Sequence, residues 1–163
     1  MRNLIFIVLA IIVPVIGISQ DVLQRLPEFE LKDIYGKVVK INDLTANGPV
    51  IISFWATWCA PCKKELEAIH EVYIDWQEET NVTLVAVSID DEKTKARVPA
   101  YVNGKGWDYV VLLDPNGDFK RTMGVNIVPH TFLIDKEGNI VYTHNSYSPG
   151  DEDKLYQEIL KLK

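Results

Sequence analysis

The chain has 163 residues, 47% of them hydrophobic and 25% charged, a balance typical of one ordinary globular domain. Its formal net charge of −6 argues against nucleic acid as a partner, because phosphate binding requires clustered lysine and arginine. Composition therefore excludes a basic nucleic-acid-binding module, and the function has to be inferred from the motifs.

Residues 1–19 have the three-part layout of a secretory signal peptide. Arg2 gives a positive start, residues 4–16 are almost continuously aliphatic, and small residues precede a cleavage site after Ser19. The apolar run is short for a permanent membrane span, which needs about 20 residues. We expect a cleaved signal peptide and, over residues 20–163, one domain in the periplasm or otherwise outside the cytoplasm. An uncleaved anchor that leaves the domain facing the periplasm is the alternative.

Beyond this segment the pattern alternates between strands and helices. Short runs of β-branched, aromatic and aliphatic residues predict strands over residues 29–31, 38–41, 50–55, 82–89, 109–113, 131–134 and 139–143. Turn residues between the first two strands, and between the last two, indicate hairpins.

Helical periodicity from Pro61 to about Glu79 predicts a long helix, with the proline in the first turn, where its missing N–H breaks no helical bond. The strands on either side of this helix complete a parallel βαβ unit. Further helices are expected over residues 93–103, where Pro99 interrupts the pattern, over residues 119–123, and from Gly150 onward.

The two cysteines stand three positions apart, in Cys59-Ala60-Pro61-Cys62, at the junction of a predicted strand and a predicted helix. A bridge over so small a loop removes little entropy from the unfolded chain, so it is a poor structural staple. Free N–H groups and the macrodipole at a helix start stabilise a thiolate. We therefore predict that Cys59 is the nucleophile, and that Cys62, one helical turn inside, is the resolving thiol.

Other uses of a cysteine pair fit the sequence less well. A zinc site needs four ligands, and the histidines, at positions 70, 130 and 144, do not form a pair at ligand spacing. Covalent haem attachment would require histidine after the second cysteine, where Lys63 stands. A static disulfide is left as an alternative that the position of the pair disfavours. The prediction is an enzyme of dithiol–disulfide exchange, which needs no metal or organic cofactor.

The segment Trp55–Cys62, WATWCAPC, resembles the active-site segment of the thioredoxin superfamily. From about Phe29 to its end, the chain is similar to the exported TlpA/ResA-like thiol–disulfide oxidoreductases. This narrower resemblance rests on the signal segment, the N-terminal hairpin, the extra residues between 90 and 117, and the segment Val128–Asp135. It implies an α/β thioredoxin fold, with a central mixed sheet flanked by helices, an N-terminal β-hairpin and an insertion after the second core strand.

The resemblance also implies a function. Proteins of this kind reduce disulfides in other proteins, receive electrons from a membrane-bound donor, and in some cases serve cytochrome c maturation. We expect a monomer. A thiol oxidant or isomerase is the alternative within the same chemistry. A peroxiredoxin-like peroxidase is a further alternative, but such enzymes usually carry Thr three residues before the nucleophile, where this chain has Ala56. A binding module without chemistry would not need both cysteines.

Two residues beside the pair take supporting roles. In the family, the proline that matches Pro129 follows a cis peptide bond and packs beside the cysteines. Trp58, directly before the nucleophile, offers an apolar rim for protein substrates, although an aromatic residue beside a motif is as often structural.

A proton acceptor for Cys62 is harder to find. Thioredoxin carries a buried Asp at the position matching Ser53, and the TlpA/ResA-like branch instead has an acid after the second core strand. Asp91 is the better match by spacing, with Glu92 next to it. We predict that Asp91 takes this proton, since the two parallel strands should end at the same edge of the sheet. The alternative is that both acids are solvated and cap the following helix.

Overall fold

The computed structural model describes residues 24–163. The predicted signal peptide lies outside the described residues, so it stays a prediction. Among the helices that the structure describes, none is both long and apolar enough to cross a membrane.

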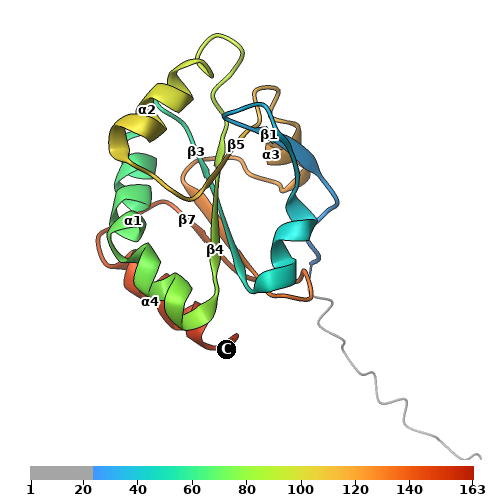
Figure 1. Ribbon diagram of the computed structural model, residues 1–163, viewed down its shortest axis with the longest axis vertical. Coiled ribbons are helices and arrows are strands. Elements are labelled where there is room, and N and C mark those ends of the chain that lie inside the picture. Colours follow the sequence, from blue (N-terminus) through green and yellow to red (C-terminus); the bar gives the residue numbers. More distant parts are fainter. Residues whose placement is uncertain (1–23) are drawn as a thin grey trace, which may run out of the picture.

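A mixed seven-stranded sheet forms the centre of the domain, in the order β2-β1-β5-β4-β3-β6-β7 (Figure 1). The strands are β1 Glu30–Asp33, β2 Val38–Lys40, β3 Val50–Trp55, β4 Thr83–Ser88, β5 Val110–Leu113, β6 His130–Ile134 and β7 Ile140–Asn145. Strands β3, β4 and β5 are parallel, and the other pairs are antiparallel. The carboxyl ends of β3 and β4 therefore meet at one edge, where the chain leaves β3 for the cysteines.

Helices cover both faces of the sheet (Figure 1). One face carries α1 Ala60–Thr80, α2 Arg97–Lys105 and α4 Asp151–Leu160, and the other carries the 3₁₀ helix η1 Ile41–Asn47 and the short α3 Asp118–Thr122. Each face has its own hydrophobic core. Neighbouring residues of β3 belong to different cores, since Trp55 packs against Tyr101 of α2 and Phe54 packs against Phe119 of α3.

The predicted α/β architecture is confirmed, including the N-terminal hairpin β1–β2 and, after β4, the inserted α2 and β5. One helix begins later than expected. The chain makes turns after β4, and α2 starts only at Arg97. This start places Pro99 in the first turn, where a missing N–H costs no helical hydrogen bond.

Candidate active site

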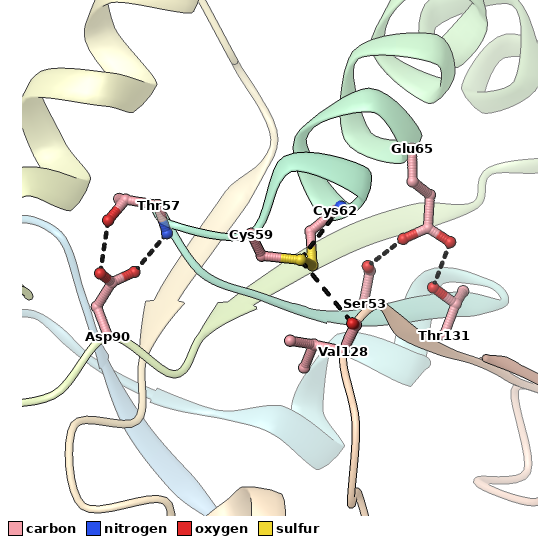
Figure 2. Close-up of a disulfide and its surroundings, with 8 residues drawn as sticks. All are labelled: Ser53, Thr57, Cys59, Cys62, Glu65, Asp90, Val128 and Thr131. Atoms are coloured by element: carbon pink, nitrogen blue, oxygen red, sulfur yellow. Dashed lines mark hydrogen bonds between the residues drawn. A yellow bond between two sulfur atoms is a disulfide. The ribbon is translucent and has the colours of Figure 1, made fainter. Parts of the chain in front are cut away.

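The two cysteines form a disulfide at the junction of β3 and α1 (Figure 2). Cys59 is the N-cap residue of α1, Pro61 lies in the first turn, and the backbone N–H of Cys62 donates to Cys59 Sγ over 3.3 Å. In the reduced protein, the same amide and the helix macrodipole would stabilise a thiolate at Cys59.

The two cysteines differ in how far solvent reaches them. Cys62 is fully buried, whereas Cys59 retains 6% of its surface, and the adjoining Trp58 is 61% exposed. On the other side, Cys59 Sγ lies 3.9 Å from the carbonyl oxygen of Val128, and the Val128–Pro129 peptide bond is cis, as the resemblance implies. An incoming group therefore meets Cys59 first.

A buried carboxyl group, that of Glu65, lies on the inner side of the pair (Figure 2). The Ser53 hydroxyl donates to Glu65 Oε2 and the Thr131 hydroxyl donates to Glu65 Oε1, each over 2.9 Å. Burial raises the pKa of Glu65 to about 7, although the two hydrogen bonds act to lower it. Because Cys62 and Glu65 are three positions apart on α1, they are neighbours on one helix face. The carboxyl therefore lies on the same buried face of α1 as the Cys62 thiol.

The sequence contains a signal for a buried Glu65, although Glu65 was not among the predicted site residues. The buried positions of α1 include Cys62, Leu66 and Ile69, and Glu65 lies on the same stripe, where an unpaired charge would be unfavourable. Ser53 is likewise the polar residue of the otherwise apolar run VIISFW. A buried acid and a buried hydroxyl on facing elements indicate a contact between them.

A second buried acid, Asp90, holds the loop that leads to the cysteines. Its carboxylate accepts hydrogen bonds from the Thr57 amide over 2.8 Å and from the Thr57 hydroxyl over 2.6 Å. It also accepts one from the Ser88 hydroxyl at the end of β4, over 2.9 Å. These bonds tie the residue before Trp58 to the neighbouring strand, so Asp90 positions the loop that carries the nucleophile.

The structure places the two predicted supporting acids at the surface. Asp91 Oδ1 accepts hydrogen bonds from the Lys93 and Thr94 amides and from the Thr94 hydroxyl, and Glu92 pairs with Lys95 over 2.7 Å. The Thr94 hydroxyl holds the pKa of Asp91 below its usual value, opposite to the shift expected of a buried proton acceptor. The buried acid at this edge of the sheet is Asp90. The contacts of Asp91 fit the alternative reading, in which it caps the turn that follows.

The histidines are dispersed. His70 Nδ1 lies 3.9 Å from Asp108, His130 stacks on Phe132, and His144 Nε2 lies 3.2 Å from Asp151. Within residues 24–163, no three or more His, Cys, Asp or Glu side chains are grouped so that they could hold a metal ion.

Residues 22–143 match the AhpC/TSA family. This chain belongs to that family. Among relatives, the thiol-disulfide oxidoreductase ResA of Bacillus thuringiensis (strain Al Hakam) is 36% identical over 115 residues, which are 71% of this chain and 64% of the relative. ResA of Bacillus subtilis (strain 168) is 35% identical over 71% of this chain and 62% of its own. The match thus spans less than two thirds of these relatives, and it confirms the resemblance to the ResA-like branch.

Solved structures agree on the fold of this AhpC/TSA-family chain. A thioredoxin-like protein from Porphyromonas gingivalis is 51% identical, with a TM-score of 0.74 over 84% of this chain and 90% of its own. A Chlorobium tepidum protein, described as the thiol:disulfide interchange protein DsbE, is 30% identical, with a TM-score of 0.77 over 88% of this chain and 99% of its own. The predicted thioredoxin fold is confirmed.

The contacts of Asp90 generate a stability prediction. Asp90→Ala leaves the Thr57 and Ser88 donors without their acceptor, and we expect it to lower the free energy of unfolding by about 3 kcal/mol. Asp91→Ala is the matched control, since it removes a solvent-exposed turn cap, and its loss of stability should be clearly smaller. Urea unfolding of the oxidised proteins measures both. Equal losses in the two variants would contradict the role given to Asp90.

Proposed function

We propose that this chain is a thiol–disulfide oxidoreductase that reduces disulfides in extracytoplasmic proteins through Cys59 and Cys62. The observation that carries the proposal is the asymmetry of the pair. The less buried cysteine, Cys59, caps the helix N-terminus beside the exposed Trp58. The other, Cys62, is fully buried, and three positions further along the same helix is a buried carboxyl whose pKa is about 7. The names of the ResA relatives and of the Chlorobium tepidum protein describe the same chemistry and support the proposal.

In the first step, the Cys59 thiolate attacks a disulfide of the substrate protein. A bond forms between Cys59 Sγ and one substrate sulfur, while the substrate disulfide breaks and its other sulfur leaves as a thiolate. The Cys62 amide and the start of α1 favour the thiolate that begins this step.

In the second step, Cys62 loses its proton to Glu65 and attacks Cys59 Sγ. The new bond between the cysteines forms as the mixed disulfide breaks, and the second substrate sulfur leaves as a thiolate. Two electrons have passed to the substrate, and the protein has reached the disulfide state that the structure shows. Burial in apolar surroundings makes a thiol hard to ionise, which is why the step needs an acceptor such as Glu65.

The setting of the reaction is also part of the proposal. The signal-like pattern of residues 1–19 supports a location outside the cytoplasm, either after cleavage or on an anchor. The resemblance to TlpA/ResA-like proteins supports the reductive direction, a membrane-bound electron donor, and cytochrome c maturation as one use. A monomer suffices for this chemistry, since both cysteines and Glu65 come from one chain.

The peroxidase alternative has weaker support. Thr57 is the threonine nearest to the nucleophile in the motif, and its hydroxyl donates to Asp90 in the loop contact described above. Ala56 occupies the position where a peroxiredoxin usually carries its threonine.

Cys59 should be the thiol that reacts with external reagents. Alkylation of the reduced protein near neutral pH, followed by peptide mass spectrometry, should label Cys59 well before Cys62, which is fully buried. Cys62→Ala should accumulate mixed disulfides with substrate proteins because the resolving thiol is missing, while Cys59→Ala serves as the control that traps none. Earlier labelling of Cys62 would reverse the two roles.

Glu65→Gln should slow the resolving step by about 100-fold near pH 8, because the acceptor for the Cys62 proton is lost. In the wild type this rate should rise as pH increases through about 7, where Glu65 ionises, and the rise should be absent in the variant. Stopped-flow oxidation of the reduced proteins at a series of pH values measures the rate of the resolving step. Asp91→Asn is the control, with an unchanged profile.

The ionisation of Glu65 should also affect the free energy of unfolding, which should fall over the pH range in which the rate of the resolving step rises. The folded pKa of Glu65 is raised, so its contribution to stability is present below the unfolded value of 4.5 and is lost as pH rises towards about 7. Glu65→Gln should therefore gain stability relative to the wild type over that interval. If the free energies of unfolding of the wild type and of Glu65→Gln change with pH in the same way, Glu65 does not titrate as proposed.

The reductive direction sets the expected potential. Equilibration with glutathione buffers, followed by thiol trapping, should place the potential of the pair nearer to the roughly −270 mV of thioredoxin than to the roughly −120 mV of a strong oxidant. A value at the oxidising end would assign the chain to thiol oxidation instead.

A further inference from the structure

A small cavity lies behind Glu65, where α1, β6, β7 and α4 meet. Its wall includes Glu65, Thr131, His144, Asp151 and Glu152. Its volume, about 10 Å³ for the centre of a water-sized sphere, is close to the room that one water molecule needs. The wall is polar enough to hold such a water by hydrogen bonds.

A buried carboxyl needs a route for exchanging its proton with solvent. Only 4% of the surface of Glu65 is exposed, and its two oxygens already accept bonds from the buried hydroxyls of Ser53 and Thr131. Because its pKa is about 7, Glu65 is protonated in part of the reduced molecules near neutral pH, and it cannot accept the Cys62 proton until it has lost its own. The cavity is the polar space beside this carboxyl, and it adjoins a side chain that reaches solvent.

Strand register connects this carboxyl to the surface. Ser53 of β3 is paired with Thr131 of β6, and Thr131 is paired with His144 of β7. Directly opposed residues of neighbouring strands point to the same face, so the three side chains form a polar row across the sheet, under α1. The side chain of His144 is 31% exposed, and it therefore lies between the cavity and solvent.

His144, the residue of this polar row that is nearest to solvent, contacts α4. His144 Nε2 lies 3.2 Å from Asp151 Oδ2, and Asp151 also accepts from Lys154 Nζ and from the Ser148 amide. The Lys154 bond, before the others, lowers the pKa of Asp151 to about 2, so this partner of the imidazole stays charged.

The remaining titratable groups at the cavity are Tyr142 of β7, which stacks on His144, and Glu152 of α4, which accepts from the Tyr147 hydroxyl. Asp151 and Glu152 both add to the raised pKa of Glu65. His144 brings an imidazole to the cavity wall, and imidazole is a side chain that proteins commonly use as a proton shuttle.

We propose that His144 relays protons between Glu65 and solvent, through the Thr131 hydroxyl and one water in the cavity. The inference rests on the proposed function, because it concerns how Glu65 becomes free to accept the Cys62 proton. Before the resolving step the O–H bond of a protonated Glu65 breaks, and its proton passes through the Thr131 hydroxyl and the cavity water to the imidazole. The imidazole releases an equivalent proton to bulk water, which can return it to the substrate thiolates. Asp151 is a positioning residue that orients the ring.

The test is a single-turnover oxidation of the reduced protein by a peptide disulfide, in weakly buffered solution. His144→Gln should slow the resolving step roughly tenfold, less than the loss of the acid itself, because slower routes to solvent persist. Added imidazole should restore the rate in proportion to its concentration, as a diffusible relay can act at the exposed end of the cavity. The wild type should not respond to imidazole.

His70→Gln is the matched control, since it removes an imidazole that also faces an aspartate, Asp108, on another part of the domain. It should leave the rate unchanged. His144→Asn provides a second variant should the first fold poorly, and thermal unfolding checks both.

Each outcome decides between the two proposals. An unchanged rate in His144→Gln, or a slow rate that imidazole does not restore, would overturn the relay and leave the exchange reaction standing. Failure of the wild type to reduce disulfides would instead overturn the proposed function itself.

Discussion

The carboxyl group of Glu65 is held inside the domain by the hydroxyls of Ser53 and Thr131. This contact joins α1 to β3 and β6, the two strands beneath it, so it fixes how the helix that carries the cysteines sits on the sheet. A buried carboxyl is costly unless it is hydrogen-bonded, and rotation of α1 would remove both donors. The two bonds offset part of the cost of burial, and what remains appears as the raised pKa. Position and reactivity thus have the same physical origin.

The features that could be predicted from the sequence are those set by local patterns. Apolar periodicity, turn residues and the position of Pro61 identified the hairpins, the parallel βαβ unit and a helix that begins at the cysteines. The acid of the site was different, because its contacts join residues 12 and 66 positions apart. The prediction that the two strands are parallel and end at the same edge of the sheet is confirmed. There, the side chain of Asp91 is satisfied by its own turn, and Asp90 turns inward to Thr57, a difference of one residue that no periodicity reveals.

The resemblance to thioredoxin places a buried Asp at the position of Ser53. Here a shorter hydroxyl side chain stands on the strand, and the carboxyl comes from the helix opposite, with Glu65 reaching down to meet it. The same chemical group is therefore supplied to the same side of the redox pair from a different backbone position. A consequence is that the carboxyl and Cys62 share one helix, so their spacing is set by helical geometry rather than by how helix and sheet pack.

This arrangement places electron transfer and proton transfer, both of which thiol exchange requires, on opposite sides of the cysteine pair. In the proposed reaction, electrons enter and leave through Cys59, beside the exposed Trp58 and the Val128 carbonyl. The proton of the second thiol would move the other way, from Cys62 to Glu65, whose carboxyl is held by Ser53 and Thr131 under α1. A substrate seated over Cys59 covers the outer side of the pair and keeps water from it. Because the carboxyl lies on the inner side, a docked substrate does not block the path of the proton, and the resolving step can proceed while the mixed disulfide is still covered.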